Sequence, residues 1–268
     1  MEKDKISYYR DILINPVKEC ALYKPRFGHS KKNGYSLADF QSLYRGDAFY
    51  SWLGLDNDLM YSAHKAAGGI TSIYRQIGIG CERLVRSVFM DYLGLSKTDV
   101  VWSYKVKGSG NRERTLYLDA RIIFNKIENE KVKNKFYSWM SGIAENLAIT
   151  SSIQDAIKGI VFEVRQGYKS KDSKRQNADI SNAANAYANG YVPCLMLMSA
   201  QIDDDIVSRY YMAKWAILQG TFEESPLLST FSFFDKIIGF DFLEFMDSNK
   251  EYFRGVVRQV LIKLMDAE

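Results

Sequence analysis

The sequence has few of the residues that zinc sites, disulfide frameworks and thiol or imidazole catalysis require. Its three cysteines, Cys20, Cys81 and Cys194, lie far apart without a CxxC spacing, and its only histidines are His29 and His64. A structural zinc site needs four such ligands at short spacings, so this pattern argues against zinc and against a disulfide framework. No serine lies in a GxSxG motif, so a Ser-His-Asp hydrolase is not expected either. If the chain is an enzyme, carboxylates and a metal ion are its expected tools.

Long apolar runs are also missing. The segment MEKDKISYYR at the start is charged, and no run approaches the 18 or more uncharged apolar residues of a membrane span. We therefore expect a soluble, cytoplasmic protein that does not associate with a membrane.

Proline is scarce, with four residues in 268, whereas 47% of the residues are hydrophobic, among them 18 Tyr and 15 Phe. Such a chain can bury a large core and has few helix breakers. Because no repeat, low-complexity tract or Pro/Gly/Ser-rich linker divides it, we expect one domain. Its core is expected over about 78–200, with mainly helical additions over 1–77 and 201–268. The formal net charge of +4 permits a polyanionic partner without requiring one.

Helical periodicity appears in several parts of the chain. Apolar residues from Cys81 to Leu93 recur every three or four positions, which predicts a helix that ends at Gly94. The pair Gly68-Gly69 is expected to separate this helix from shorter ones over 37–66. Further helices are predicted over 4–22, where a break at Pro16 is the alternative to a continuous helix, over 128–157 and 177–190, from Asp203 to about Leu218, and in the remainder to Glu268.

Between these helices the hydrophobic period changes to that of strands. Residues 99–106 and 114–124 are rich in β-forming residues and flank a Gly-containing turn, which predicts an antiparallel hairpin. Residues 159–164 and the apolar run 191–200 predict two more strands. The order of elements therefore predicts an α/β fold, in which a central mixed β-sheet is flanked by helices and extended by helical N- and C-terminal additions.

Two of the predicted strands carry a single acidic residue. Alternation in RTLYLDARIIF places Asp119 on the face opposite the apolar residues, and alternation in GIVFEVRQG places Glu163 and Arg165 on one face. If the two strands are neighbours, the two carboxylates converge. Such a pair suits Mg²⁺, which takes one or two carboxylates together with waters and phosphate oxygens. An ion pair of Arg165 with Asp119 or Glu163 is the alternative.

The arrangement of these residues resembles the PD-(D/E)XK nuclease superfamily: an acid on one strand, an acid-x-cation triplet on the next, then a helix and an apolar strand, all preceded by a helix that bears Glu82 (GIGCERLVRSVF). The size and single-domain organisation resemble type II restriction endonucleases more narrowly. The resemblance covers about residues 78–200. It implies that Asp119 and Glu163 are catalytic metal ligands for Mg²⁺, and that Glu82 is the helical acid that some members add to the metal site.

Two positions depart from the family pattern. Leu118 replaces the proline before the first acid, and Arg165 stands in the position of the catalytic lysine. Because arginine stays protonated, Arg165 is expected to hold a phosphate or stabilise developing charge rather than act as a general base. Gln166, Lys169 or Lys171 are the candidates to substitute for the lysine. Glu82 also has Arg86 four residues ahead, so an ion pair on the helix is the alternative to metal binding there.

Three cationic stretches, over 24–34, 105–114 and 168–177, combine Lys and Arg with Gly, Ser, Asn or Gln. Lysine and arginine neutralise DNA phosphates, whereas amide and guanidinium groups also read base edges. The third stretch directly follows Glu163 and would lie near the scissile phosphate. Its candidate DNA-binding residues are Gln166, Lys169, Lys171, Lys174, Arg175, Gln176 and Asn177. Solvated surface loops are the alternative, above all for the first stretch.

These features together predict a Mg²⁺-dependent type II restriction endonuclease that hydrolyses phosphodiester bonds in double-stranded DNA at a specific short sequence. A homodimer would cut both strands of a palindromic site by two-fold symmetry. Two alternatives stay open: a nucleic-acid-binding protein that keeps the fold without the chemistry, and a nuclease for repair or for RNA.

Overall fold

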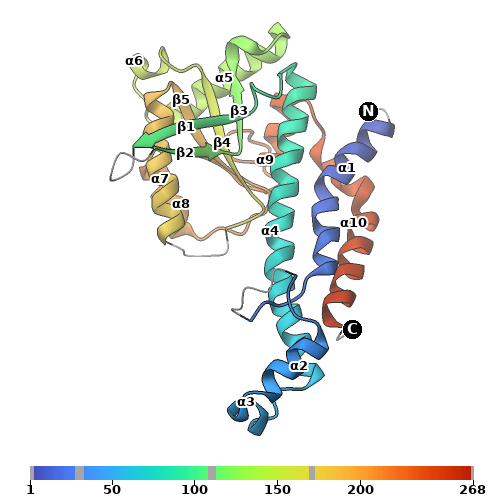
Figure 1. Cartoon of the computed structure of the whole chain (residues 1–268). Coiled ribbons are helices and arrows are strands. Elements are labelled where there is room, and N and C mark those ends of the chain that lie inside the picture. The colour runs from blue at the N-terminus through green and yellow to red at the C-terminus, as the bar shows by residue number, and fades with distance from the viewer. Residues whose placement is uncertain (1–2, 28–32, 108–112, 169–172, 267–268) are drawn as a thin grey trace. The chain divides into compact units, whose positions relative to one another are not determined.

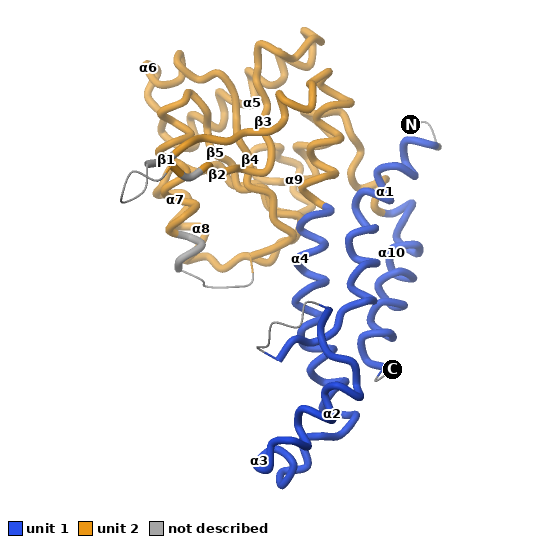
Figure 2. Tube along the Cα trace, viewed as in Figure 1, with its two compact units in different colours: residues 1–80, 247–268 blue, residues 81–246 orange. Residues whose placement is uncertain are grey.

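The structure, a computed structural model, describes residues 3–27, 33–107, 113–168 and 173–266. The chain divides into two compact units, residues 1–80 with 247–268 and residues 81–246 (Figure 2). The second unit contains most of the core that the sequence predicts over about 78–200, and continues it to Met246.

The first unit is helical in its described residues. Buried apolar side chains from three helices pack together, among them Val17, Ile73 and Val260. The predicted helix over 4–22 is present, and it continues through Pro16 to Lys18 before a 3₁₀ turn. The elements of this unit are α1 (Lys3–Lys18), the 3₁₀ helix η1 (Glu19–Leu22), α2 (Leu37–Arg45), α3 (Ala48–Trp52), most of α4 (Asp58–Leu93) and most of α10 (Phe242–Met265).

The expected break at Gly68-Gly69 is wrong, because α4 runs through both residues. These glycines allow close packing instead of ending a helix. A Cβ at Gly69 would lie 2.6 Å from the side chain of Leu264, and a Cβ at Gly80 would lie 2.2 Å from the backbone oxygen of Leu13. Glycine is therefore required at Gly80, where the close atom belongs to the backbone, whereas at Gly69 the end of the Leu264 side chain would have to move.

The second unit is built on a mixed four-stranded sheet of order β3-β4-β5-β6. Three of its strands, β3, β4 and β5, are labelled in Figure 1. Strand β3 is antiparallel to β4, whereas β4, β5 and β6 run parallel. The predicted hairpin is present as β1 and β2, which form a separate two-stranded sheet. The strands are β1 (Trp102–Lys107), β2 (Glu113–Leu118), β3 (Ala120–Ile123), β4 (Gly159–Arg165), β5 (Tyr191–Leu197) and β6 (Ala216–Leu218). A mixed α/β fold is thus confirmed.

Helices account for most of the rest of this unit. They are the last part of α4, the 3₁₀ turn η2 (Phe124–Lys126), α5 (Glu130–Asn146), α6 (Ser151–Gln154), α7 (Ser173–Ala188), α8 (Asp204–Met212), α9 (Thr230–Ser232), the π-helical turn η3 (Phe233–Ile238) and the start of α10.

Three predicted helices have different bounds. The one expected over 128–157 is interrupted at Ala148, whose φ of 48° is left-handed, so α5 and α6 are separate. The one expected to reach Leu218 ends at Met212; Lys214 also has a left-handed φ, and Ala216 then begins β6. Helix α7 begins at Ser173, four residues before its expected start at Asn177.

The sheet has buried residues on both faces, which explains the near-continuous apolar runs of β4 and β5. On one face, Phe162 lies 5.3 Å from Phe89 of α4 and 5.9 Å from Phe233, measured between ring centroids. On the other face, Val161 and Leu195 belong to a cluster with residues of the hairpin, α7 and α8. The odd-numbered residues of β4, Glu163 and Arg165 included, therefore share the face that α7 and α8 cover.

Candidate active site

Asp119 lies at a bend between β2 and β3, where the chain passes from the hairpin into the four-stranded sheet. Its neighbours Leu118 and Ala120 are buried, whereas Asp119 is partly exposed, as the alternation of the sequence predicts. Its backbone N–H donates to the oxygen of Phe162 at 2.8 Å, and its Oδ2 accepts a hydrogen bond from the N–H of Val164 at 2.8 Å. Asp119 is thus attached to β4 on both sides of Glu163, through its backbone N–H at Phe162 and through its carboxylate at Val164.

Glu163 lies between the two residues of β4 that bind Asp119. The paired register of β3 and β4 ends with Ala120 opposite Phe162, and Asp119 lies just outside it, at the bend. The side chain of Glu163 is 14% exposed. The two strands are neighbours, as convergence of the two acids requires.

Arg165 does not point into solvent, since its side chain is 6% exposed. Its Nη2 lies 3.0 Å from Oε1 of Glu163 and 2.5 Å from Oδ2 of Asp179 on α7. The ion pair of Arg165 with Glu163, which the sequence leaves open as the alternative to metal binding by the acids, is therefore present. Burial favours a lower pKa for Arg165, but the attraction of Glu163 and Asp179 outweighs it, so the pKa is raised and the guanidinium stays charged.

Asp179 is a member of this cluster that the sequence analysis did not identify. Its Oδ2 also accepts a hydrogen bond from the hydroxyl of Tyr210 on α8, which lies 3.2 Å from the hydroxyl of Tyr168. The ring of Tyr168 lies 4.9 Å from the guanidinium carbon of Arg165. Burial, and then the Asp179 carboxylate, raise the pKa of Tyr210, so its hydroxyl keeps its proton. The one sequence signal was that Asp179 is the only acid in the sequence of α7.

Glu82 forms the ion pair with Arg86 that helical spacing allows, with 3.6 Å between Oε2 and Nη2. Nε of Arg86 also donates to the backbone oxygen of Asp119. Arg86 thus links α4 to the bend that carries Asp119. Glu82 contacts Arg86 from one turn earlier on the same helix.

The structure describes only some of the residues that are expected to bind DNA. Gln166 is half-buried just after β4, and Asn177 on α7 is exposed and accepts a hydrogen bond from Arg209 at 3.1 Å. Lys169 and Lys171 lie outside the described residues. The backbone of Lys174, Arg175 and Gln176 belongs to the first turn of α7, but their side chains are outside the described part.

The acidic pair suits Mg²⁺ better than a metal that needs a full set of protein ligands. Within the described residues, no group of three or more His, Cys, Asp or Glu side chains is placed to hold a metal ion. Magnesium keeps several waters and needs only one or two carboxylates when a phosphate supplies further oxygens. Asp119 and Glu163 fit that requirement, and their hard oxygen donors match the ion.

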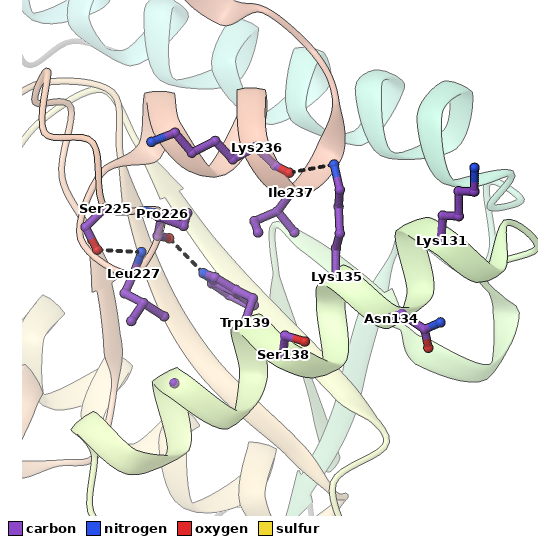
Figure 3. Close-up of a pocket in the computed structure, with 11 residues that line it drawn as sticks. Lys131, Asn134, Lys135, Ser138, Trp139, Ser225, Pro226, Leu227, Lys236 and Ile237 are labelled. Carbon is purple, nitrogen blue, oxygen red and sulfur yellow. Dashed lines mark hydrogen bonds between the residues drawn. The ribbon is translucent and has the colours of Figure 1, made fainter.

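A separate hollow of about 550 Å³ lies between α5 and the segment that leads into α10 (Figure 3). Lys135 and Lys236 line it, but Lys135 donates to the backbone oxygen of Lys236, and Lys236 donates to that of Glu224. Trp139 likewise donates to the oxygen of Pro226 at 2.7 Å. These side chains hold the segments together, and none of the predicted site residues lines the hollow.

Comparison of the chain with families of known proteins, with curated proteins and with solved structures finds no match. In the described part of the chain, none of the helices has both the length and the apolar character needed to cross a lipid bilayer.

Proposed function

We propose that the chain is a Mg²⁺-dependent endonuclease that hydrolyses phosphodiester bonds in double-stranded DNA, and more narrowly a type II restriction endonuclease of the PD-(D/E)XK kind. The observation that supports this proposal is that Asp119, at the bend before β3, is bound to the residues on either side of Glu163 in the neighbouring strand β4. The order that follows, an acid-x-cation strand, a helix and a parallel strand, is the order that the sequence resemblance implies.

In this proposal Asp119 and Glu163 hold the metal ion. A Mg²⁺ ion bound there would lower the pKa of a water and offset the charge that builds on the phosphorus centre. Val164 fixes the Asp119 carboxylate through its N–H, and Arg86 fixes the backbone of the same residue. Glu82 serves mainly to hold Arg86, and becomes a metal ligand only if the ion pair opens.

Arg165 has a different role from the phosphate contact expected from the sequence. Its guanidinium is buried and contacts two carboxylates, so we assign it to the support of Glu163. Cations of the segment 168–177 are then the candidates for the scissile phosphate, with Gln166 and Asn177 at its edge. A homodimer on a palindromic site remains part of the proposal, because two copies related by two-fold symmetry would place one such site on each DNA strand.

The test is digestion of a sequenced plasmid by the purified full-length chain in Mg²⁺ and in EDTA. We expect discrete fragments in Mg²⁺ only, and their ends would give the recognition sequence. Asp119→Asn and Glu163→Gln should abolish the fragments, whereas Asp155→Asn, an exposed acid of the same unit, should leave them unchanged. Fragments that persist in both site variants would refute the assignment.

A second function is favoured by one specific observation. A buried Arg165 in the lysine position provides no general base, which suits a nucleic-acid-binding protein that keeps this fold without chemistry. Salt-sensitive retention of DNA without cutting would identify such a binder. Smeared rather than discrete fragments, or cleavage of RNA, would instead indicate a nuclease for repair or for RNA.

A further inference from the structure

The role assigned below to Asp179 rests on the proposed metal site at Asp119 and Glu163. Arginine stays charged at every physiological pH, unlike a lysine, which loses its proton readily when buried. A permanent positive charge 3.0 Å from Oε1 of Glu163 opposes the binding of a second cation to the same carboxylate. A metal site with arginine at this position therefore needs a compensating negative charge.

Asp179 is placed to supply that charge. Its Oδ2 lies 2.5 Å from the same Nη2 that contacts Glu163, and its side chain is 7% exposed. Asp119, Glu163, Asp179 and Arg165 together carry two more negative than positive charges, as do two carboxylates beside a neutral lysine. Glu82 and Arg86 cancel one another and leave this balance unchanged.

Aromatic side chains next to Asp179 also fix its position. Tyr210 donates its hydroxyl to the same Oδ2, and Tyr168 lies next to both Tyr210 and Arg165. These side chains come from β4, α7, α8 and the segment between β4 and α7, so four parts of the fold meet at the guanidinium. Such an arrangement keeps Arg165 turned toward Asp179.

We propose that Asp179 is a positioning residue that neutralises Arg165 and thereby allows Glu163 to bind a divalent cation. Asp179 itself is not a metal ligand; it acts through Arg165. Partners of this kind in metal sites typically account for a factor of about 10 to 100 in metal affinity.

The experiment measures Mn²⁺ binding to the full-length chain by isothermal titration calorimetry, without DNA and without an activity readout. Asp179→Asn should weaken the affinity by about 10- to 100-fold. The double variant Arg165→Gln/Asp179→Asn removes both charges and should return to within about threefold of the unmodified chain. Tyr210→Phe, which removes a hydrogen bond to Asp179 but no charge, is the matched control and should also stay within about threefold.

The possible outcomes separate this inference from the proposed function. If Asp119→Asn abolishes Mn²⁺ binding while Asp179→Asn leaves it unchanged, the metal site stands and the role of Asp179 is refuted. If the unmodified chain binds no Mn²⁺, or if Asp119→Asn binds it equally well, the metal site fails and this inference fails with it. If Asp179→Asn does not fold, the double variant Arg165→Gln/Asp179→Asn decides. A loss of Mn²⁺ affinity of more than about tenfold in that variant would contradict charge compensation.

Discussion

Val164 donates its backbone N–H to Oδ2 of Asp119 across the junction of β3 and β4, at 2.8 Å. This bond joins the chain segment that leaves the hairpin to the strand that carries Glu163 and Arg165. A hydrogen bond from a backbone N–H to a carboxylate is stronger than one between neutral groups. It therefore has both a structural part, which orients the side chain, and an electrostatic part, which stabilises its charge.

Substitution of Asp119 should separate these two parts. Asparagine retains an oxygen that can accept a hydrogen bond from Val164. The free energy of unfolding of Asp119→Asn should therefore stay within about 1 kcal/mol of that of the unmodified chain, whereas that of Asp119→Ala should fall by about 1–3 kcal/mol. Both should lose Mn²⁺ binding. Urea denaturation followed by circular dichroism, with a Mn²⁺ titration of each variant, checks this, and equal stability of the two variants would show that the bond contributes little.

Arg165 should be important for folding as well as for the site. Arg165→Ala leaves Glu163 and Asp179 buried without their cation, and breaking a buried pair in this way costs about 3–5 kcal/mol. Lys105→Ala is the control in the same unit, because its pair with Glu113 is exposed and should contribute less than about 1 kcal/mol. Denaturation midpoints measure both changes. A loss below 1 kcal/mol for Arg165→Ala would mean that water reaches the cluster.

The proximity of Asp119 and Glu163 was accessible from the sequence because strand alternation has a period of two. That period put each acid on a defined face, and only the adjacency of the two strands had to be assumed. The partner of Arg165 was not accessible in this way. Asp179 lies 14 residues further on, on a helix whose rotation about its axis no local pattern defines.

The differences in the fold have a similar origin. Strand β6 has three residues, and its pairing with β5, not its own pattern, makes it a strand. The left-handed residues Ala148 and Lys214, which separate or end helices, are of types that propensity places inside helices. The sequence alone suggests a helix break at Gly68 and Gly69, but in the fold α4 continues through them and other side chains pack against both.

The turn before β1 should make stability depend on pH. The hydroxyl of Ser96 donates to Oδ2 of Asp99 at 2.5 Å, and this bond is the largest cause that holds the pKa of Asp99 below its usual value of 3.8. A carboxyl whose pKa is depressed in the folded state stabilises the protein above the unfolded pKa, and this contribution is lost as the pH falls through the folded pKa.

Accordingly, Asp99→Asn should be less stable than the unmodified chain above about pH 5, and the difference should shrink toward about pH 2. Ser96→Ala removes the donor and should show the same trend. Urea denaturation at several pH values measures both. A difference that stays constant with pH would contradict the assigned cause.

Two glycines of α4 should respond in opposite directions to the same substitution. A Cβ at Gly80 would lie 2.2 Å from the backbone oxygen of Leu13, which can move away only if the backbone of α1 shifts, so Gly80→Ala should destabilise the chain by about 1–3 kcal/mol. At Gly78 nothing lies within 4 Å of the added carbon, so Gly78→Ala should stabilise the helix by roughly 0.5–1 kcal/mol through its better propensity. Thermal denaturation of both variants decides the question: if Gly80→Ala also gains stability, α1 and α4 do not pack as closely as the structure shows.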